Sequence, residues 1–399
     1  MKVAVLGRGT SSIITTLQLL KHNHEVTVFY DPNLPHINVG ESTTVPIANL
    51  LYDVLGLNTH DLVSMGLCSY KMGINFVDWG VGKSFHHNFF ENNISFHFET
   101  QKFNKFIHKH LDDNGYVKYI PIKINKFLVE NNKVIICDRL FDFVVNCTGW
   151  DSEDYYYEPF FETVNSAILF KKDYPEYSDI HSLHLATEDG WQFGLPFPQE
   201  STFKCGYLFN DKLISQDDAL KKLPKDADVY EKYSWKPRSR KYILDTNNIA
   251  SNGNRLFFFE PLQAMTLHYT NEFALMICEF LGNRTQYEFD RINHKYNDFI
   301  YSQLLCLAYH YQFGSVHDSE FWKVKSEQAQ TIMDASPMGR GQRFIDAIKY
   351  DFRYDNYVSK VAWMVPQDHV YIHNGMTGKE WIGLNEKSIY LWLLDILKG

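Results

Sequence analysis

The sequence lacks the patterns that mark several large classes of protein. Its six cysteines are scattered and show neither C-x-x-C spacing nor the Cys/His spacing of metal sites, which argues against a disulfide framework and a zinc centre. We therefore expect no metal, and free thiols in a reducing cytoplasm. No apolar run approaches the roughly 20 residues that span a bilayer, and no signal peptide precedes the first expected strand, so we expect no membrane association.

Positive charge is also scarce. There are 39 Lys and Arg against 48 Asp and Glu, a net charge of −9, with no dense basic cluster, which argues against nucleic acid as a partner. Apolar residues make up 45% of the chain and aromatic residues 16%, as in a folded globular protein with many rings to line pockets. At 399 residues, the chain should form two lobes or one large α/β body with insertions.

The first 31 residues carry the strongest local pattern. An apolar run, Val3 to Leu6, enters a Gly-rich turn, and a helix-like segment then leads to a second apolar run, Glu25 to Tyr30. In such a strand–turn–helix–strand unit, backbone N–H groups of the turn approach a pyrophosphate at the positive end of the helix. The residues expected at this dinucleotide site are Gly7, Gly9, Thr10, Ser11 and Ser12. Because Ser12 stands where a third glycine is usual, a plain βαβ unit is the alternative.

An acidic residue at the end of the second strand often holds a ribose hydroxyl in these units. Asp31 lies one place later than expected, directly after Tyr30. A turn residue before Pro32 is an equally supported interpretation of Asp31.

The next motif introduces a family resemblance. Residues 39–46, Val-Gly-Glu-Ser-Thr-Thr-Val-Pro, are similar to the V-G-E-A-T-x-P strap that covers the isoalloxazine ring in flavin-dependent halogenases, with one extra residue before the proline. The resemblance, which implies that this chain is a short and divergent member of the tryptophan-halogenase-like group, makes Gly40, Glu41, Ser42 and Thr43 cofactor contacts. On its residues alone, the run is equally a helix N-terminus with a nearby proline.

A lysine follows at the family's separation. From Ser69 to Trp79, apolar and polar residues alternate, which predicts one strand with one buried face and leaves Lys71 on a solvated face. However, the segment resembles the halogenase pattern in which a lysine precedes x-F-x-x-W, and Lys71 falls on the family's catalytic lysine. The run Phe85 to Phe89 also resembles the aromatic-His-x-Phe run found after that lysine.

Two further segments resemble flavoprotein motifs. The strand ending in Thr148-Gly149 is similar to the one that closes the flavin domain of glutathione-reductase-like proteins, although a strand followed by glycine can also be a simple turn. Residues 190–196, Gly-Trp-Gln-Phe-Gly-Leu-Pro, resemble the halogenase signature W-x-W-x-I-P and retain Trp191 and Pro196. A packed core strand is the alternative for Trp191.

Residues 252–266 are similar to the family segment G-D-A-A-x-F-x-D-P-L-E-S-T-G, in which amides at a helix start hold flavin and halide. By this resemblance Phe259 and Leu262 contact flavin, and Met265 and Thr266 hold halide. Gln263 replaces the glutamate of tryptophan halogenases at this catalytic position. Glu260 is a rival carboxylate, on the position of the aspartate before proline.

The resemblance implies an α/β, glutathione-reductase-like FAD-binding fold with a substrate-side sheet and a helical C-terminal region. We expect an FAD-binding body over 1–270, with substrate-side segments interleaved at about 66–130 and 155–245, and a mainly helical region over 271–399. Locally, Phe96 to His110 is expected to be a helix, and Asn131 to Trp150 a hairpin of apolar strands.

The implied activity uses FAD as FADH2, with O2 and halide as co-substrates, to make hypohalous acid that reaches an aromatic substrate through Lys71. Because Gln263 cannot carry charge, we expect activated phenols, pyrroles or indoles rather than free tryptophan, and bromide or iodide rather than chloride. No second Gly-rich nucleotide motif is evident, so reduced flavin should come from a separate flavin reductase, and a homo-oligomer is left open. The alternatives are a flavin-dependent aromatic monooxygenase and a non-catalytic flavin-binding protein.

Overall fold

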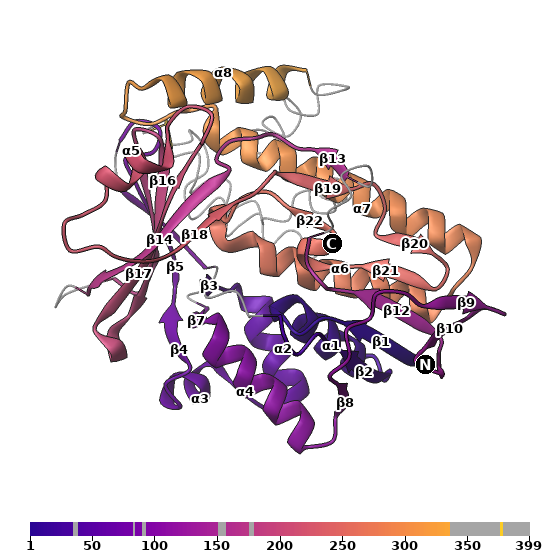
Figure 1. Ribbon diagram of the computed structural model, residues 1–399. Coiled ribbons are helices and arrows are strands. Elements are labelled where there is room, and N and C mark those ends of the chain that lie inside the picture. Colours follow the sequence, from indigo (N-terminus) through magenta and orange to yellow (C-terminus); the bar gives the residue numbers. More distant parts are fainter. Residues whose placement is uncertain are drawn as a thin grey trace, which may run out of the picture.

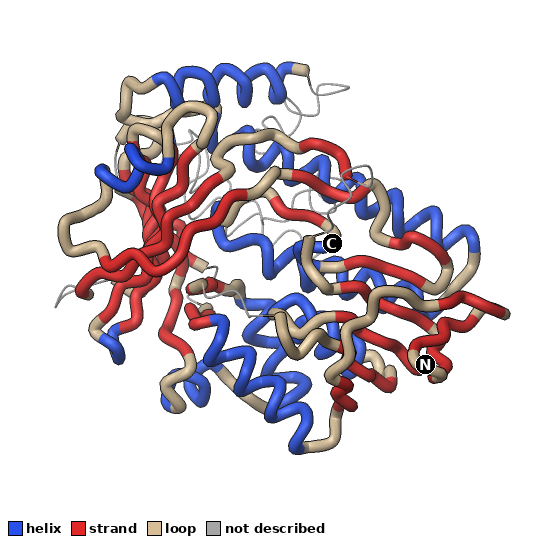
Figure 2. Tube along the Cα trace, in the orientation of Figure 1, coloured by secondary structure: helices blue, strands red, loops and turns tan. Residues whose placement is uncertain are grey.

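The computed structural model describes residues 1–34, 39–82, 84–89, 93–150, 157–174, 179–335 and 376–377. The chain forms two lobes around two large sheets, with long helices packed along them (Figures 1 and 2). Most of the expected helical region beyond residue 335 lies outside the described residues. Among the described residues, no helix is long and apolar enough to cross a membrane.

The first lobe is built on a six-stranded sheet, in which five neighbouring strands are parallel and β20 is an antiparallel edge. In spatial order the strands are β20 (Leu244–Thr246), β21 (Ile249–Ser251), β12 (Phe143–Asn146), β1 (Lys2–Leu6), β2 (Glu25–Phe29) and β8 (Val117–Ile120). The expected order of strand, turn, helix and strand at the N-terminus is confirmed, because α1 (Thr10–Lys21) joins β1 to β2.

Both faces of this sheet are covered. Val3 and Val5 of β1 pack into the core with residues of the helices, whereas Ala4 and Leu6 pack with the meander on the opposite face. Because successive side chains of a strand point to opposite faces, double coverage explains the continuous apolar run at the N-terminus. The helices are α1, α2 (Val45–Leu55), α4 (Thr100–Asp113), α6 (Met265–Gly282) and α7 (Gln286–Tyr311), and the meander comprises β9 (Leu128–Glu130), β10 (Lys133–Ile136) and β11 (Arg139–Phe141).

The second lobe is built on a seven-stranded sheet that gathers segments far apart in the sequence. In spatial order its strands are β18 (Asp228–Ser234), β14 (Ser166–Asp173), β17 (Thr202–Phe209), β16 (Gly190–Phe197), β15 (Ser182–Thr187), β5 (Gly73–Val77) and β6 (Phe85–Asn88). One face packs on α5 (Gln216–Lys221). The other packs its aromatic side chains against α7 and α8 (Glu320–Asp334).

Short elements connect the lobes. One three-stranded sheet has the order β3 (Gly40–Ser42), β7 (Ser95–Glu99) and β4 (Cys68–Lys71), and another has the order β13 (Tyr157–Pro159), β19 (Arg238–Arg240) and β22 (Phe257–Phe258). The remaining elements are α3 (Thr59–Ser64) and 3-10 helices at Pro198–Glu200, Gly253–Arg255 and Leu262–Ala264.

Three local expectations were wrong. The strand expected from Ser69 is two strands in different sheets, because the chain changes sheet at Met72. There Gly73 has φ 157°, and a Cβ would lie 2.2 Å from the His87 carbonyl. The helix expected from Phe96 begins only at Thr100, because residues 95–99 form β7 and pair with two strands. In the third case, β10 and β11 form a hairpin, but β12 pairs in parallel with β1.

Candidate functional site

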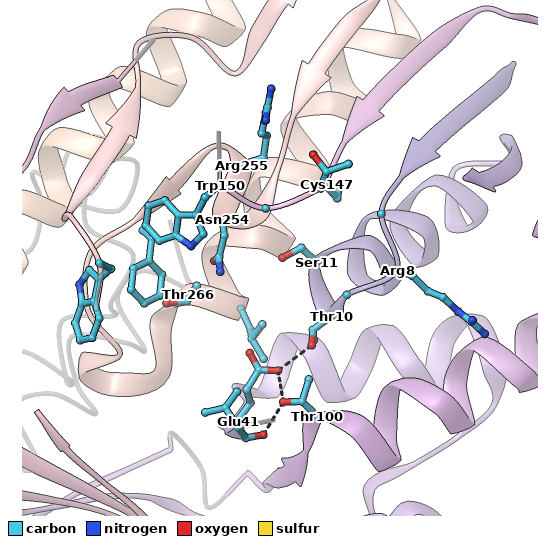
Figure 3. A pocket seen from close by; sticks show the side chains of 18 of the residues that line it. Arg8, Thr10, Ser11, Glu41, Thr100, Cys147, Trp150, Asn254, Arg255 and Thr266 are labelled. Atoms are coloured by element: carbon cyan, nitrogen blue, oxygen red, sulfur yellow. Dashed lines mark hydrogen bonds between the residues drawn. The ribbon is translucent and has the colours of Figure 1, made fainter. Parts of the chain in front are cut away.

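A cavity of about 1450 Å³ lies between the two lobes, and residues of both line it. It exceeds the roughly 300–1,000 Å³ of most small-molecule sites, so it has room for a dinucleotide. Figure 3 shows its wall, where helix starts and strand ends converge. The expected cofactor residues in the lining are Gly7, Gly9, Thr10, Ser11, Asp31, Gly40, Glu41, Ser42, Thr148 and Gly149.

The two glycines of the first turn are required for different structural reasons. Gly7 has φ 112°, and a Cβ there would lie 2.6 Å from the Cys147 carbonyl oxygen, so the close approach to β12 requires glycine. Gly9 is the N-cap of α1, with no side-chain cap, and a Cβ there would meet no protein atom within 4 Å. The first N–H groups of α1 therefore face an open space, which suits a pyrophosphate.

The turn role of Asp31 is confirmed, and its position is compatible with the ribose role, which stays a prediction. Asp31 lines the cavity, as a ribose ligand must, and its Oδ1 accepts a hydrogen bond from the Asn33 amide at 2.9 Å, as in a turn. Lys123 Nζ lies 3.4 Å from Oδ2. Nearby, the Arg8 guanidinium lies 4.4 Å from the centre of the Tyr30 ring. Sequence reasoning missed Arg8 and Lys123, which no motif marked.

The strap segment joins three elements at the cavity. The Glu41 carboxylate accepts hydrogen bonds from the Thr10 hydroxyl at 2.8 Å and the Thr100 hydroxyl at 3.1 Å (Figure 3). Burial raises the pKa of Glu41, and the two hydrogen bonds oppose that rise. The helix-start interpretation of this stretch is confirmed, because Thr44 is the N-cap of α2. Gly40 to Ser42 form β3, and their contact with a cofactor stays a prediction.

Lys71 is fully buried at the end of β4 and does not lie on a solvated face. Its Nζ donates a hydrogen bond to the Thr43 carbonyl oxygen at 2.9 Å and lies 5.2 Å from the centre of the Phe89 ring. Within the described residues, no carboxylate forms an ion pair with it. Desolvation lowers the pKa of Lys71 from 10.5 to about 7. A buried amine without a counter-charge is costly and is characteristic of a functional group.

A buried string of polar side chains runs from the strand of Lys71 to the cavity. His97 Nδ1 lies 3.4 Å from the Ser69 hydroxyl, and His97 Nε2 lies 2.8 Å from the Ser182 hydroxyl. Ser182 contacts Ser42 at 3.2 Å, and both of these serines line the cavity. Burial, and then the Lys71 charge, holds the pKa of His97 well below its ordinary value, so the ring is neutral. The sequence did not single out His97, because we expected its segment to be helical.

Gln263 lies in a strained turn before α6. Its φ is 59° and that of Ala264 is 57°, a conformation that side chains other than glycine adopt at a cost. The amide Nε2 of Gln263 lies 2.5 Å from His310 Nε2. His310 Nδ1 lies 2.8 Å from the Cys306 carbonyl, which can only accept, so Nδ1 carries the proton. Burial lowers the pKa of His310 to about 4, so the ring is neutral and Gln263 donates to its lone pair.

The start of α6 also reaches the cavity. Its N-cap is Ala264, and no side chain caps the first turn. Ala264 and Thr266 line the cavity, whereas Met265 points into the core of the first lobe. The N–H groups of a first helical turn have no partner within the helix, so this end can hold an anion.

An aromatic layer lies behind the lining. Trp191 is fully buried, with ring centres 4.7 Å from His184 and 6.2 Å from Trp79. Phe259 stacks on Phe160 with ring centres 3.6 Å apart. Of the predicted site residues, those outside the cavity lining, as far as the structure describes it, are Ser12, Thr43, Lys71, Trp191, Pro196, Phe259, Leu262, Gln263 and Met265.

Glu260 is sealed inside the protein. Each carboxylate oxygen is 3.2 Å from the Tyr311 hydroxyl, and Oε2 also accepts from the Thr163 hydroxyl. Burial raises the pKa of Glu260 to about 7. The carboxyl group is not part of the cavity lining, so its bonding is that of a structural group.

Several cavity residues escaped the sequence reasoning. They are Trp150, Trp235, Arg240, Tyr242, Asn254 and Arg255. Asn254, Arg255 and Trp150 lie in segments that the sequence analysis considered, but it gave them no role, and only the fold brings all of these residues together.

Comparison with known proteins gives consistent results. The family model described as "Tryptophan halogenase" matches residues 2–94 and 91–361. The tryptophan 6-halogenase ThaL of Streptomyces albogriseolus is 21% identical over 419 aligned positions, which cover 82% of this chain and 78% of ThaL.

Solved structures show the same fold. A tryptophan halogenase from Shewanella frigidimarina has a TM-score of 0.80 at 18% identity and covers 98% of this chain and 92% of its own. BrvH, a flavin-dependent halogenase from Brevundimonas sp. BAL3, has a TM-score of 0.77 at 16% identity and covers 100% and 94%. The α/β fold class expected from the sequence is therefore confirmed.

Proposed function

This chain belongs to the tryptophan halogenase family and is therefore an enzyme, and we propose that it uses FADH2, O2 and halide to halogenate an electron-rich aromatic substrate. The observation that carries this proposal is the buried amine of Lys71, which contacts the strap residue Thr43 and has no carboxylate partner among the described residues.

The cavity fits the cofactor. The open N-terminus of α1 at Gly9, Thr10 and Ser11 would hold the pyrophosphate, since a negative charge suits the positive end of a helix. Asp31 would hold the ribose, and Gly40 to Ser42 would cover the ring together with Thr148 and Gly149. Bound reduced FAD supplies, with O2, the oxidising power that turns halide into hypohalous acid. Phe259 and Leu262 would support the flavin from behind the lining.

The halide would bind at the start of α6. The first-turn amides of Met265 and Thr266 stand at a helix start without a side-chain cap, and Thr266 lines the cavity, so they would be the N–H donors nearest to a bound anion. We infer a preference for bromide or iodide, because larger halides are easier to oxidise and Ala264-Met265-Thr266 departs from the family's Ser-Thr-Gly.

Lys71 would carry the halogen to the substrate. Its neutral amine attacks the halogen of hypohalous acid, an N–X bond forms and the O–X bond breaks, and the departing hydroxide takes the amine proton as water. The ring then takes the halogen from nitrogen and loses a proton, which restores the amine. Alternatively, protonated Lys71 polarises hypohalous acid by hydrogen bonding. A pKa of about 7 leaves both forms populated at neutral pH.

The substrate class follows from the groups around the reacting ring. Gln263 is uncharged, and its donated bond to His310 holds it in place, so it cannot stabilise a cationic intermediate as a carboxylate would. Glu260 is bonded to Tyr311 and Thr163 and does not reach the cavity. We therefore infer phenols, pyrroles or electron-rich indoles as substrates, rather than free tryptophan.

The remaining parts of the proposal concern organisation and setting. We propose that 1–270 forms the FAD-binding body, with substrate-side segments at about 66–130 and 155–245, and that 271–399 forms the C-terminal region. A separate reductase would supply reduced flavin. The six free cysteines suit a reducing cytoplasm.

The experiment that tests this function is incubation of the protein with reduced FAD, O2 and chloride, bromide or iodide in turn, over phenols, pyrroles, indoles and tryptophan, with products read by mass. Halide-dependent mass gains on phenols or indoles are expected. Halide-independent addition of oxygen would instead identify a monooxygenase, and flavin oxidation without any aromatic product would identify a non-catalytic flavoprotein.

A further inference from the structure

A cluster of three ionisable side chains lies on the second lobe, away from the cavity lining. His86 is on the edge strand β6, and Asp179 and His181 immediately precede β15. Their candidate ligand atoms all lie within 4.8 Å of one another. No motif marks this cluster, because its two segments lie 93 positions apart in the chain.

Sheet register explains how these segments meet. Ser182 of β15 pairs with Ile74, and Asn88 of β6 pairs with Gly73, so His181 and Asn88 flank β5 at Gly73. The middle strand therefore contributes no side chain between them. His181 Nε2 lies 2.7 Å from Asn88 Oδ1, and an amide oxygen can only accept, so Nε2 carries a proton.

The other nitrogen of His181 faces a carboxylate. Since Nε2 is protonated, the Nδ1 of a neutral ring has a lone pair, and that lone pair points at Asp179 Oδ1, which also accepts the His181 amide at 3.1 Å. Two acceptors in contact require a proton between them, so this pair shares a hydrogen bond in the metal-free protein, and a metal ion would have to replace that proton as the two atoms move apart. The second oxygen of Asp179 lies 3.3 Å from His86 Nε2.

One of these separations, and the second bond of His181, match a zinc site. Ligands at about 2.0–2.2 Å from a tetrahedral ion are roughly 3.3–3.6 Å apart, which is the separation of His86 Nε2 and Asp179 Oδ2. Metal-bound histidines usually donate their other N–H to an oxygen acceptor, as His181 does to Asn88. We propose that His86, Asp179 and His181 bind a divalent transition-metal ion of the zinc class, with the remaining position open to water.

The ion would act as a clamp on the edge of the sheet. It would join β6 to the start of β15 across β5. Phe89 directly follows Asn88, and its ring lies 5.2 Å from Lys71 Nζ, while Ser182, next to His181, lines the cavity. The clamp therefore holds the strands that lead to both parts of the reaction site. Two nitrogen donors favour Zn²⁺, Co²⁺ or Ni²⁺ over Mg²⁺ or Ca²⁺.

The test is titration of the chelator-treated full chain with ZnCl2 by calorimetry, together with Co²⁺ visible absorption and thermal melting. The Cys137→Ser background is used throughout, because Cys137 is the exposed thiol among the free cysteines. We expect one ion per chain, tetrahedral Co²⁺ bands and a higher melting temperature with Zn²⁺. Asp179→Asn and His86→Ala should each weaken Zn²⁺ binding at least tenfold.

The chain offers a matched control. His294 and Asp298 on α7 form an exposed pair at 3.6 Å and, within the described residues, belong to no three-ligand cluster. His294→Ala should leave Zn²⁺ binding unchanged. Undetectable binding, or equal binding by Asp179→Asn and the parent protein, would overturn the proposal. Because these readouts need no turnover, they are independent of the proposed halogenation.

Discussion

Lys71 donates its Nζ hydrogen bond to the backbone carbonyl of Thr43, 2.9 Å away. Thr43 lies in the strap, directly after the strap residues that line the cavity, whereas Lys71 ends β4 and lies outside the lining. One hydrogen bond therefore connects the expected cofactor segment to the expected reactive amine. It also fixes the amine without a counter-charge, which leaves desolvation to lower its pKa to about 7.

Replacing Lys71 tests whether this amine acts in the reaction. Lys71→Ala should leave FAD binding and oxidation of reduced flavin nearly unchanged, while halogenated product falls by roughly 100-fold or more, as for a lost chemical group. Lys71→Arg should lose almost as much, because guanidinium stays protonated. Flavin absorbance and product mass are measured side by side. Substantial halogenation by Lys71→Ala would remove the lysine from the mechanism.

The pH dependence separates the two possible roles of Lys71. Since its pKa is lowered to about 7, the neutral amine is the minor form at pH 6 and the major form at pH 8. The haloamine route requires the neutral amine, so the rate with externally added hypohalous acid should rise as pH increases through about 7. A rate that falls over the same range would favour the hydrogen-bonding role of the protonated amine.

The burial of Lys71 is a feature that the local sequence pattern could not predict. The N-terminal βαβ unit was predictable because the hydrophobic periods of its strands and helix, and the glycines of its turn, are local signals within the first 31 residues. The alternation around Lys71 was also real, but the chain changes sheet at Gly73. After such a change, alternation no longer says which face is buried. Only the family resemblance, not the pattern, indicated a functional lysine.

The polar contacts of the site were beyond prediction for a related reason. His97 meets Ser182 across 85 positions of sequence, and Gln263 meets His310 across 47. Each pair depends on the packing of separate elements, and no spacing rule marks it. By contrast, Gly7 and Gly9 could be identified from the sequence, because both belong to one short turn between a strand and a helix.

The two turn glycines should respond differently to substitution. Gly9→Val should fold normally, because a Cβ there meets no protein atom within 4 Å, but FAD affinity should fall at least tenfold, since the pyrophosphate loses its space. Gly7→Ala should instead lower the free energy of unfolding by about 1–3 kcal/mol, through its positive φ and the contact with Cys147. Absorbance titration and thermal melting measure the two effects. Normal FAD binding by Gly9→Val would contradict the cofactor placement.

Glu260→Gln should separate stability from catalysis. The folded-state pKa of Glu260 is raised from 4.5 to about 7, so between these values the folded state binds more protons and stability falls as pH rises. The Gln variant lacks this loss. As pH rises from 5 to 8, the free energy of unfolding of this variant should increase by about 1–3 kcal/mol relative to that of wild type. This range follows from 1.36 kcal/mol per pKa unit, reduced by any hydrogen bond that the substitution removes.

Halogenation by Glu260→Gln should stay within a few-fold of wild type, because the carboxyl group is already bonded to Tyr311 and Thr163. Denaturant unfolding at the two pH values and product mass are the measurements. A loss of product as large as that in Lys71→Ala would restore Glu260 as a reaction carboxylate.

Gln263→Glu tests the inferred substrate class. The new carboxylate would face His310 Nε2, where the amide now donates at 2.5 Å, and its charge would raise the pKa of His310 from about 4. A negative charge beside the reacting ring stabilises the cationic intermediate of a less activated substrate. Product from tryptophan should therefore rise at least tenfold relative to product from a phenol, in a direct competition read by mass. Gln263→Met, which keeps the volume without charge, is the control and should leave that ratio low. If wild type already prefers tryptophan, or if Gln263→Glu leaves the ratio unchanged, then Gln263 does not determine the choice of substrate.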